Sequence, residues 1–168
     1  LFPVRVSDLA SKPIFHEVPC EDVDIGEFRV ASALVCHPGP TVGYRITAPN
    51  GRVVTYMPDH EPALGVLKFP SLPRAWTSGA GLAENSDLLI HDSQYTNAEY
   101  ATRFGWGHST VEHMLEFAKL AEVRKLVPFH HDPEHSDVTL DRMFEDAIQK
   151  AKPAYQVVPG LEGASFEV

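Results

Sequence analysis

The spacing of apolar residues changes along the chain, and the order of the changes restricts the fold. The first third carries short segments rich in β-branched and aromatic residues, a pattern typical of strands. Further on, short apolar runs alternate with two stretches whose apolar residues recur at helical spacing. Strands are expected at 4–6, 14–18, 28–35, 43–47, 52–56, 87–91, 125–129 and 155–158, with a last one from 164, and helices at 109–122 and 138–151. This order, a β-rich N-terminal part and then β-α-β-α-β, predicts an α/β fold with helices covering one face of a sheet.

Two local signals define element boundaries. The Pro-Asn-Gly sequence at 49–51 lies between two expected strands and is typical of a hairpin turn. Ser109 and Glu112 have the spacing of a capping box, so we expect Ser109 to begin the first helix. The sequence contains no repeat or linker, and residues 1–168 are expected to form a single domain.

The charge of the chain bears on its partners. The 168 residues hold 14 Lys and Arg against 23 Asp and Glu, a net charge of -9, with no basic tract. Because Lys and Arg dominate phosphate binding, we expect no strong nucleic-acid surface. Every apolar run is shorter than the about 18 residues that a membrane helix needs, so no membrane span is expected. Cys20 and Cys36 make no disulfide framework, which indicates a reducing compartment and hence the cytoplasm.

Polar clusters follow three of the expected strands at the point where each strand ends. They contain His37, Asp59, and His130 with its neighbour His131. Loops at strand ends converge above one edge of a sheet, where α/β proteins build their sites. Imidazole nitrogen and carboxylate oxygen are the usual ligands of zinc and similar divalent ions. The pattern therefore predicts a metal site, although a histidine after a strand is also a common solvated loop residue.

A second pair of residues is suited to proton transfer. His108 lies just before the expected first helix, and its imidazole titrates near neutral pH. Asp92 follows the expected strand 87–91, and a carboxylate often orients an imidazole. The spacing alone leaves open whether Asp92 meets His108, which is otherwise a cap-region residue.

Five segments make the sequence recognisable. They read HPGPTVGYR at 37–45, YMPDHEP at 56–62, DLLIHDSQ at 87–94, GHST at 107–110 and LVPFHHD at 126–132. Each resembles a motif of the metallo-β-lactamase-fold hydrolases, in the order of the ribonuclease Z-like and phosphodiesterase-like branch. The resemblance implies that the chain is part of an αββα sandwich.

The resemblance also assigns roles. It implies that His37 binds one divalent ion, His130 binds a second, and Asp59 bridges them. The ions would be zinc, with manganese or iron as alternatives. The 22-residue step from His108 to His130 fits the family pattern, which favours His130 over His131 as the ligand. His108 is the implied acid that protonates the leaving oxygen, and Asp92 is implied to hold it.

Two positions depart from the family pattern. Asp92 stands where the family has Glu, and His60 stands where the family has Thr. We expect the His60 side chain to be exposed, with a role in supporting the metal ligands as the alternative. We expect His91, His113 and His135 to be structural or solvated.

The family motif H-x-H-x-D-H does not occur in these residues. In the family this motif supplies four metal ligands, so each ion would receive only two protein ligands here, against the three usual for catalytic zinc. The chain is therefore expected to be an incomplete domain that lacks an N-terminal half, and to be weakly active or inactive alone. A sheet without its partner layer exposes an apolar face, which also predicts a homo-oligomer.

The function that these features predict is hydrolysis of a small phosphodiester or nucleotide-like substrate by a two-metal site in the intact protein. One alternative is a thioester or lactone hydrolase on the same fold. Another is a non-catalytic binding module that has lost the metal site.

Overall fold

The computed structural model describes residues 5, 8–11, 13–19 and 22–168. Its strands form one seven-stranded sheet in which spatial order equals chain order. The strands are β1 (Val23–Ile25), β2 (Phe28–Leu34), β3 (Val42–Thr47), β4 (Val53–Met57), β5 (Leu88–Asp92), β6 (Lys125–Phe129) and β7 (Gln156–Val157). The helices are the short 3-10 helix η2 (Arg74–Trp76), α1 (Ala80–Ala83), α2 (Asn97–Tyr100), α3 (Val111–Leu120) and α4 (Asp137–Ala151). This confirms the expected α/β class.

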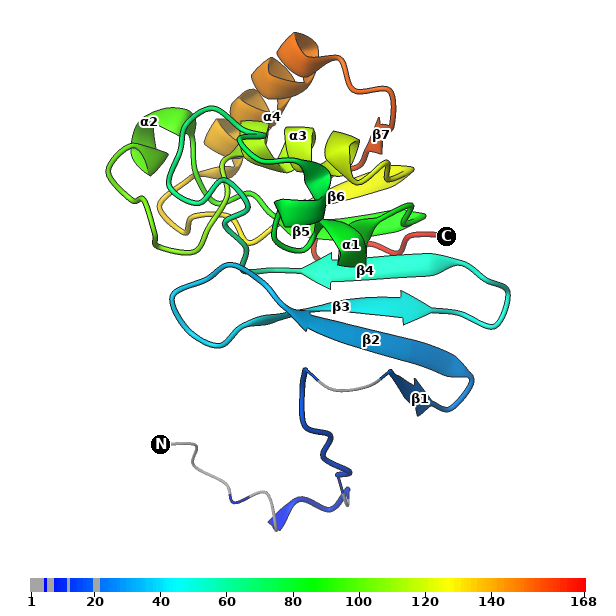
Figure 1. Ribbon diagram of the computed structural model, residues 1–168. Coiled ribbons are helices and arrows are strands. Elements are labelled where there is room, and N and C mark those ends of the chain that lie inside the picture. The colour runs from blue at the N-terminus through cyan, green and yellow to red at the C-terminus, as the bar shows by residue number, and fades with distance from the viewer. Residues whose placement is uncertain (1–4, 6–7, 12, 20–21) are drawn as a thin grey trace.

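The sheet has an antiparallel part and a parallel part. Strands β1 to β4 pair antiparallel through tight connections, including the expected turn at 49–51. Strands β4 to β7 pair parallel, and the chain returns between them through the helical segments. Figure 1 shows α3 and α4 beside the parallel strands, while β1 to β3 extend away from these two helices. Because parallel strands point the same way, the loops after β4, β5 and β6 meet at one edge of the sheet.

The core lies between α3 and the parallel strands. Met114 and Phe117 on the inner face of α3 are fully buried, as are Leu89 of β5 and Leu126 of β6. Met57 at the end of β4 is also fully buried. Burial of apolar surface is the main driving force for this arrangement, and it fixes the strand ends from which the polar loops emerge.

The expected strands at the two ends of the chain are wrong where they are described. The strand expected at 4–6 lies partly outside the described residues, and Cys20 lies outside them as well. Cys36 is described and is a free cysteine. Residues 13–19 form no strand, and Ile14 and Phe15 are 83% and 73% exposed. The tail from 164 forms no strand either. Alternating side chains stabilise a strand only when a neighbouring strand accepts its hydrogen bonds, and neither segment has one.

The start of α3 also differs from the expectation. Its N-cap is Thr110, whose hydroxyl accepts from the backbone N–H of His113. Ser109 is buried, and its hydroxyl donates to the backbone oxygen of His60 at 2.7 Å. The capping box belongs to Thr96 and Glu99 at the start of the one-turn helix α2, which the spacing of apolar residues did not reveal.

Apolar side chains are exposed at the N-terminal end of the described structure. They include Ile25 of β1 and Phe28 and Leu34 of β2. This agrees with the expected exposed apolar face, and oligomerisation remains a prediction. Among the described residues, no helix has the length and apolar character to cross a membrane.

Candidate active site

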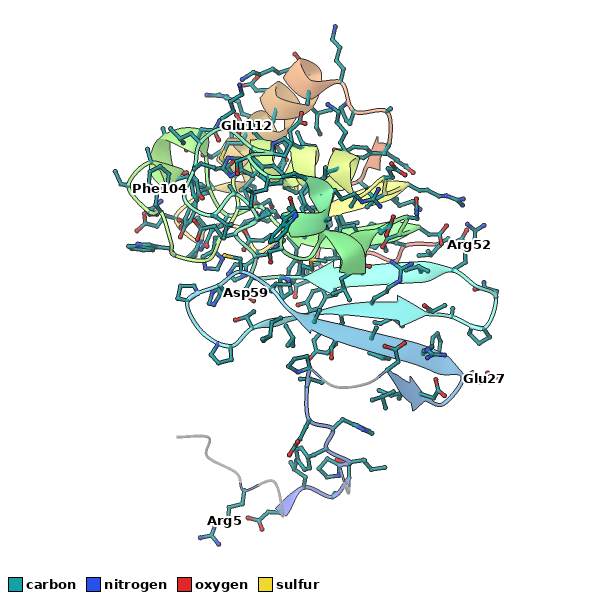
Figure 2. All side chains as sticks on the ribbon, viewed as in Figure 1. Arg5, Glu27, Arg52, Asp59, Phe104 and Glu112 are labelled. Carbon is teal, nitrogen blue, oxygen red and sulfur yellow. The ribbon has the colours of Figure 1, made fainter. Side chains whose placement is uncertain are left out.

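All five residues singled out for chemistry lie together. His37, Asp59 and His108 each present a ligand atom within 4.8 Å of the other two. Asp92, His108 and His130 do the same. They come from the loops after β2, β4 and β6, from the end of β5, and, for His108, from two residues before the N-cap of α3. In Figure 2, Asp59 lies at the opposite end of β4 from Arg52, on the same side of the molecule as Phe104 of the loop before α3.

Asp92 and His108 form a hydrogen-bonded pair. Nδ1 of His108 lies 2.6 Å from Oδ2 of Asp92, whose side chain is fully buried. The other carboxylate oxygen accepts from the backbone N–H groups of Ser109 at 2.9 Å and Gln94 at 3.2 Å. These bonds fix the carboxylate, so the aspartate side chain reaches the imidazole at the position where the family has Glu.

Two opposing effects act on the pKa of His108. Burial lowers it, but the hydrogen bond to Asp92 and the negative charges of Asp92, Asp59 and Glu61 outweigh burial, so the net pKa is raised above its usual value. A protonated His108 can donate from Nε2 while Nδ1 stays bound to Asp92.

His130 has the tautomer that a metal ligand needs. Its Nδ1–H donates to the backbone oxygen of Pro58 at 2.7 Å and lies 3.3 Å from Oδ1 of Asp59. Nε2 of the neutral ring therefore keeps a free lone pair. His131 instead lies near Ser93 and against the ring of Phe144, and it belongs to neither cluster of ligand atoms.

His37 is oriented by its own loop. Its Nδ1 lies 3.0 Å from the hydroxyl of Thr41, which in turn donates to the backbone oxygen of Gly39 at 3.2 Å. Nδ1 also lies 3.4 Å from the backbone N of Gly39, so the loop contacts the ring at this nitrogen. Asp59 shares one cluster with His37 and contacts His130, so its carboxylate has a neighbouring imidazole on each side. Two imidazoles and a carboxylate fit zinc, manganese or iron.

The loop before α3 approaches His37 at Gly107. A Cβ at this position would lie 2.1 Å from Cδ2 of His37 and 2.6 Å from Cδ of Pro38, and the backbone φ is +95°. Glycine is therefore required here by both conformation and space.

We expect Gly107→Ala to lower the free energy of unfolding by more than the about 1–2 kcal/mol that a left-handed backbone costs an L residue. The matched control is Gly105→Ala, because Gly105 also has positive φ, +77°, but no atom lies within 4 Å of its Cβ. Denaturant unfolding of both variants measures the difference, and NMR of the His37 ring reports its displacement. Equal destabilisation with an unmoved ring would contradict the predicted clash.

Glu61 is a site residue that the sequence reasoning missed. Its buried carboxylate accepts from the Tyr100 hydroxyl at 2.7 Å and from the backbone N–H groups of Gly105 and Gly107 at 2.9 and 2.8 Å. The hydrogen bond to Glu61 and burial raise the pKa of Tyr100, with burial the larger cause. Glu61 thus fastens the loop before His108 to the loop after β4. A glutamate in a loop carries no signal of this role.

His60 and His91 are fully buried and bonded to each other, with Nδ1 of His60 2.8 Å from Nε2 of His91. The expected exposure of His60 is therefore wrong. Burial lowers the pKa of His91 to about 4, and burial together with the charge of His91 lowers that of His60 well below its usual value. His113 and His135 are also structural, since they bond to the backbone of Leu67 and to Glu99.

Two aromatic side chains and an arginine between them lead outward from His108. The Tyr95 ring meets the His108 ring edge-on, with centroids 5.9 Å apart. The Arg103 guanidinium lies over Tyr95 at 4.8 Å and over Trp106 at 5.9 Å. Trp106 is 58% exposed, so it presents an aromatic surface beside the site.

A cavity of about 560 Å³ lies apart from these residues, between α4 and the C-terminal segment. Leu140, Phe144 and Ile148 of α4 line it, together with Val157 and Leu161. None of the five candidate site residues borders it.

Comparisons with known proteins identify the family of the chain. Residues 16–131 match the family described as the Beta-lactamase superfamily domain. Ribonuclease Z of Brevibacillus brevis is 32% identical over 122 residues, which are 70% of this chain and 34% of that protein. Zinc phosphodiesterase ELAC protein 1 of Homo sapiens is 27% identical over 174 residues, covering 89% of this chain and 46% of that protein. The chain thus spans between about a third and a half of the length of these relatives.

Solved structures show the same fold. The metallo-β-lactamase fold protein YhfI from Bacillus subtilis aligns with a TM-score of 0.62 at 18% identity, over 87% of this chain and 52% of that one. The short form of human tRNase Z, ELAC1, aligns with a TM-score of 0.55 at 21% identity, over 82% and 42% of the two chains.

Proposed function

The chain belongs to the beta-lactamase superfamily, in its ribonuclease Z-like branch, and from this premise we propose that it carries the proton-donating pair and part of the metal ligands of a phosphodiester hydrolase. The observation that carries the proposal is the meeting of His37, Asp59 and His130 around the His108–Asp92 pair. Ligands and a candidate acid within a few ångströms of each other are what hydrolysis of a phosphodiester requires.

His37 and Asp59 would hold one divalent ion, and Asp59 and His130 a second. Such ions activate water at neutral pH and offset the charge that develops on the phosphoryl oxygens. Catalytic zinc sites usually take three protein ligands, and this chain offers two to each ion. We therefore propose that polypeptide outside these 168 residues, or a partner chain, supplies the others.

The chain's own residues would handle the proton. His108, held at Nδ1 by Asp92, would donate from Nε2 to the oxygen that leaves phosphorus. The Asp92 carboxylate, fixed by two backbone N–H groups, would keep the ring in this orientation and stabilise its protonated form.

For the substrate we propose a phosphodiester with a nucleotide on one side. The names ribonuclease Z and tRNase Z refer to RNA, which does not fit the small substrate expected from the net charge of -9. A nucleotide-linked phosphodiester is the chemistry common to both readings. Trp106, exposed and stacked on Arg103, offers a surface for a base next to His108.

In the intact enzyme, Trp106→Ala should raise KM about tenfold for the p-nitrophenyl ester of thymidine 5′-phosphate, since base stacking contributes about 1–3 kcal/mol. It should leave KM for methyl p-nitrophenyl phosphate unchanged, because this ester has the same leaving group and no base. Trp76→Ala, at a 77% exposed position in η2, is the control. An equal change with both esters would argue against a base-binding surface.

Metal analysis beside a hydrolysis assay tests the proposed function. The intact protein should hold about two ions and cleave bis-p-nitrophenyl phosphate faster than the 168-residue chain alone. Cleavage of thioesters or lactones with no phosphodiester cleavage would favour another hydrolase. Neither metal nor cleavage in the intact protein would favour a binding module.

A further inference from the structure

A row of hydrogen bonds, partly buried at Cys36 and Ser78 and fully buried at the two imidazoles, connects the His37 loop with the Asp92–His108 pair. It runs from the backbone N–H of Cys36 to the hydroxyl of Ser78 at 2.8 Å, and from Ser78 to Nε2 of His60 at 3.2 Å. It continues from His60 to His91 at 2.8 Å, and from Nδ1 of His91 to the backbone oxygen of Asp92 at 2.8 Å. Both imidazoles are 0% exposed.

The two ends of this row determine where every proton lies. The backbone oxygen of Asp92 can only accept, so Nδ1 of His91 carries a proton and Nε2 of the neutral ring accepts. Nδ1 of His60 must then be the donor to His91, which leaves Nε2 of His60 to accept. At the other end, the N–H of Cys36 can only donate, so Ser78 receives it and passes its own proton to His60. The bonds are satisfied in one direction only.

The same residues hold the main chain of the site. The backbone oxygen of His60 accepts from the Ser109 hydroxyl at 2.7 Å, and its N–H points to Oδ2 of Asp92 at 3.4 Å. The Phe117 ring packs against both imidazoles, with centroids 5.1 and 4.8 Å away. Neither imidazole contacts solvent, so neither can take part in the reaction directly.

We propose that His60 and His91 are positioning residues: a pair of neutral imidazoles, each protonated on Nδ1, that sets the placement of the His37 loop relative to the Asp92–His108 pair. The importance of that placement rests on the proposed function, but the pair itself does not.

NMR of the 15N-labelled chain tests the tautomers. Free histidine prefers the proton on Nε2, so finding both His60 and His91 protonated on Nδ1 would support the directed row. Nε2–H in either ring would overturn it. This measurement needs neither metal nor activity, so it can succeed or fail independently of phosphodiester hydrolysis.

Two substitutions of His91 separate positioning from packing. Glutamine places its carbonyl oxygen where Nε2 was and can still accept from His60, whereas asparagine places its amide near the Nδ1 position and cannot reach His60. We expect His91→Gln to retain the Nδ1–H signal of His60 but to shift the ring signals of His108, because glutamine no longer donates to the backbone oxygen of Asp92. We expect His91→Asn to lose the Nδ1–H signal of His60 but to retain the ring signals of His108, because its amide can still donate to that oxygen. Identical spectra for the two variants would overturn the proposal.

Ser78→Ala provides a second test if His91→Asn does not fold, because Ser78 is only partly buried. It removes the link between Cys36 and His60 while leaving the two imidazoles bonded to each other. The ring signals of His37 should shift and those of His108 should remain. Unchanged His37 signals would contradict a positioning role for the row.

Discussion

Glu61→Ala should lower the free energy of unfolding by about 3–5 kcal/mol, because hydrogen bonds to a charged acceptor contribute about 1.5–3 kcal/mol each and buried donors are costly to leave unpaired. The Tyr100 hydroxyl and the N–H groups of Gly105 and Gly107 would all lose their acceptor. The released loop carries His108, so the arrangement of the site should loosen together with the fold.

Denaturant unfolding of three variants makes this prediction specific. Tyr100→Phe removes one of the three bonds, together with the bond that the hydroxyl accepts from the backbone N–H of Gly65, and should still cost less than Glu61→Ala. Glu61→Gln keeps the shape but turns an amide toward one donor, so its cost should be intermediate. Glu116→Ala, on a helix position that is 37% exposed and paired with Lys119, should have almost no effect. A loss for Glu61→Ala similar to that for Glu116→Ala would show that the carboxylate does not fasten the loop.

For a phosphodiester with an alcohol leaving group, His108→Ala in the intact enzyme should reduce kcat by about 10²–10⁴, the usual contribution of a positioned general acid. The loss should be much smaller for a p-nitrophenyl ester, whose phenolate leaves without being protonated. Metal content should not change, because the proposed ligands are His37, Asp59 and His130. The metal content of the variant distinguishes a proton donor from a metal ligand. His108 has to be tested as a ligand because it lies close to His37 and Asp59.

Asp92→Asn is the companion variant. An amide can still accept from the N–H of Ser109, but its NH₂ group would face Nδ1 of His108 and favour the wrong tautomer. We expect a rate loss comparable to that of His108→Ala, with the fold retained. Full activity in either variant would remove the pair from the mechanism, and loss of metal from His108→Ala would make His108 a ligand.

The parallel strands could be predicted from the sequence because burial on both faces leaves continuous apolar runs. Residues 125–129 are confirmed as β6, and 87–91 and 52–56 are each one residue from β5 and β4. The strand at 14–18 is wrong because a suitable pattern cannot show whether a neighbouring strand exists. The four-residue helix α2 and its N-cap Thr96 were not predicted, because one turn is too short to show a helical period.

The site also contains residues that the sequence could predict and residues that it could not. His37, Asp59 and His130 could be expected to meet because each follows a strand, and strand ends converge. The role of Glu61 could not be identified and that of His60 could not be decided, since both depend on partners at least 18 residues away in the chain. A sequence indicates which side chains can do chemistry more readily than which side chains hold them in place.

The spatial order of the strands limits how this site can be completed. Each strand from β2 to β6 already has a neighbour on both sides, so a further strand could be added only beside β1 or β7. The additional ligands that we propose would therefore come from polypeptide packed on a face of the sheet or over the ends of its strands, and not from a strand inserted between two of the existing ones.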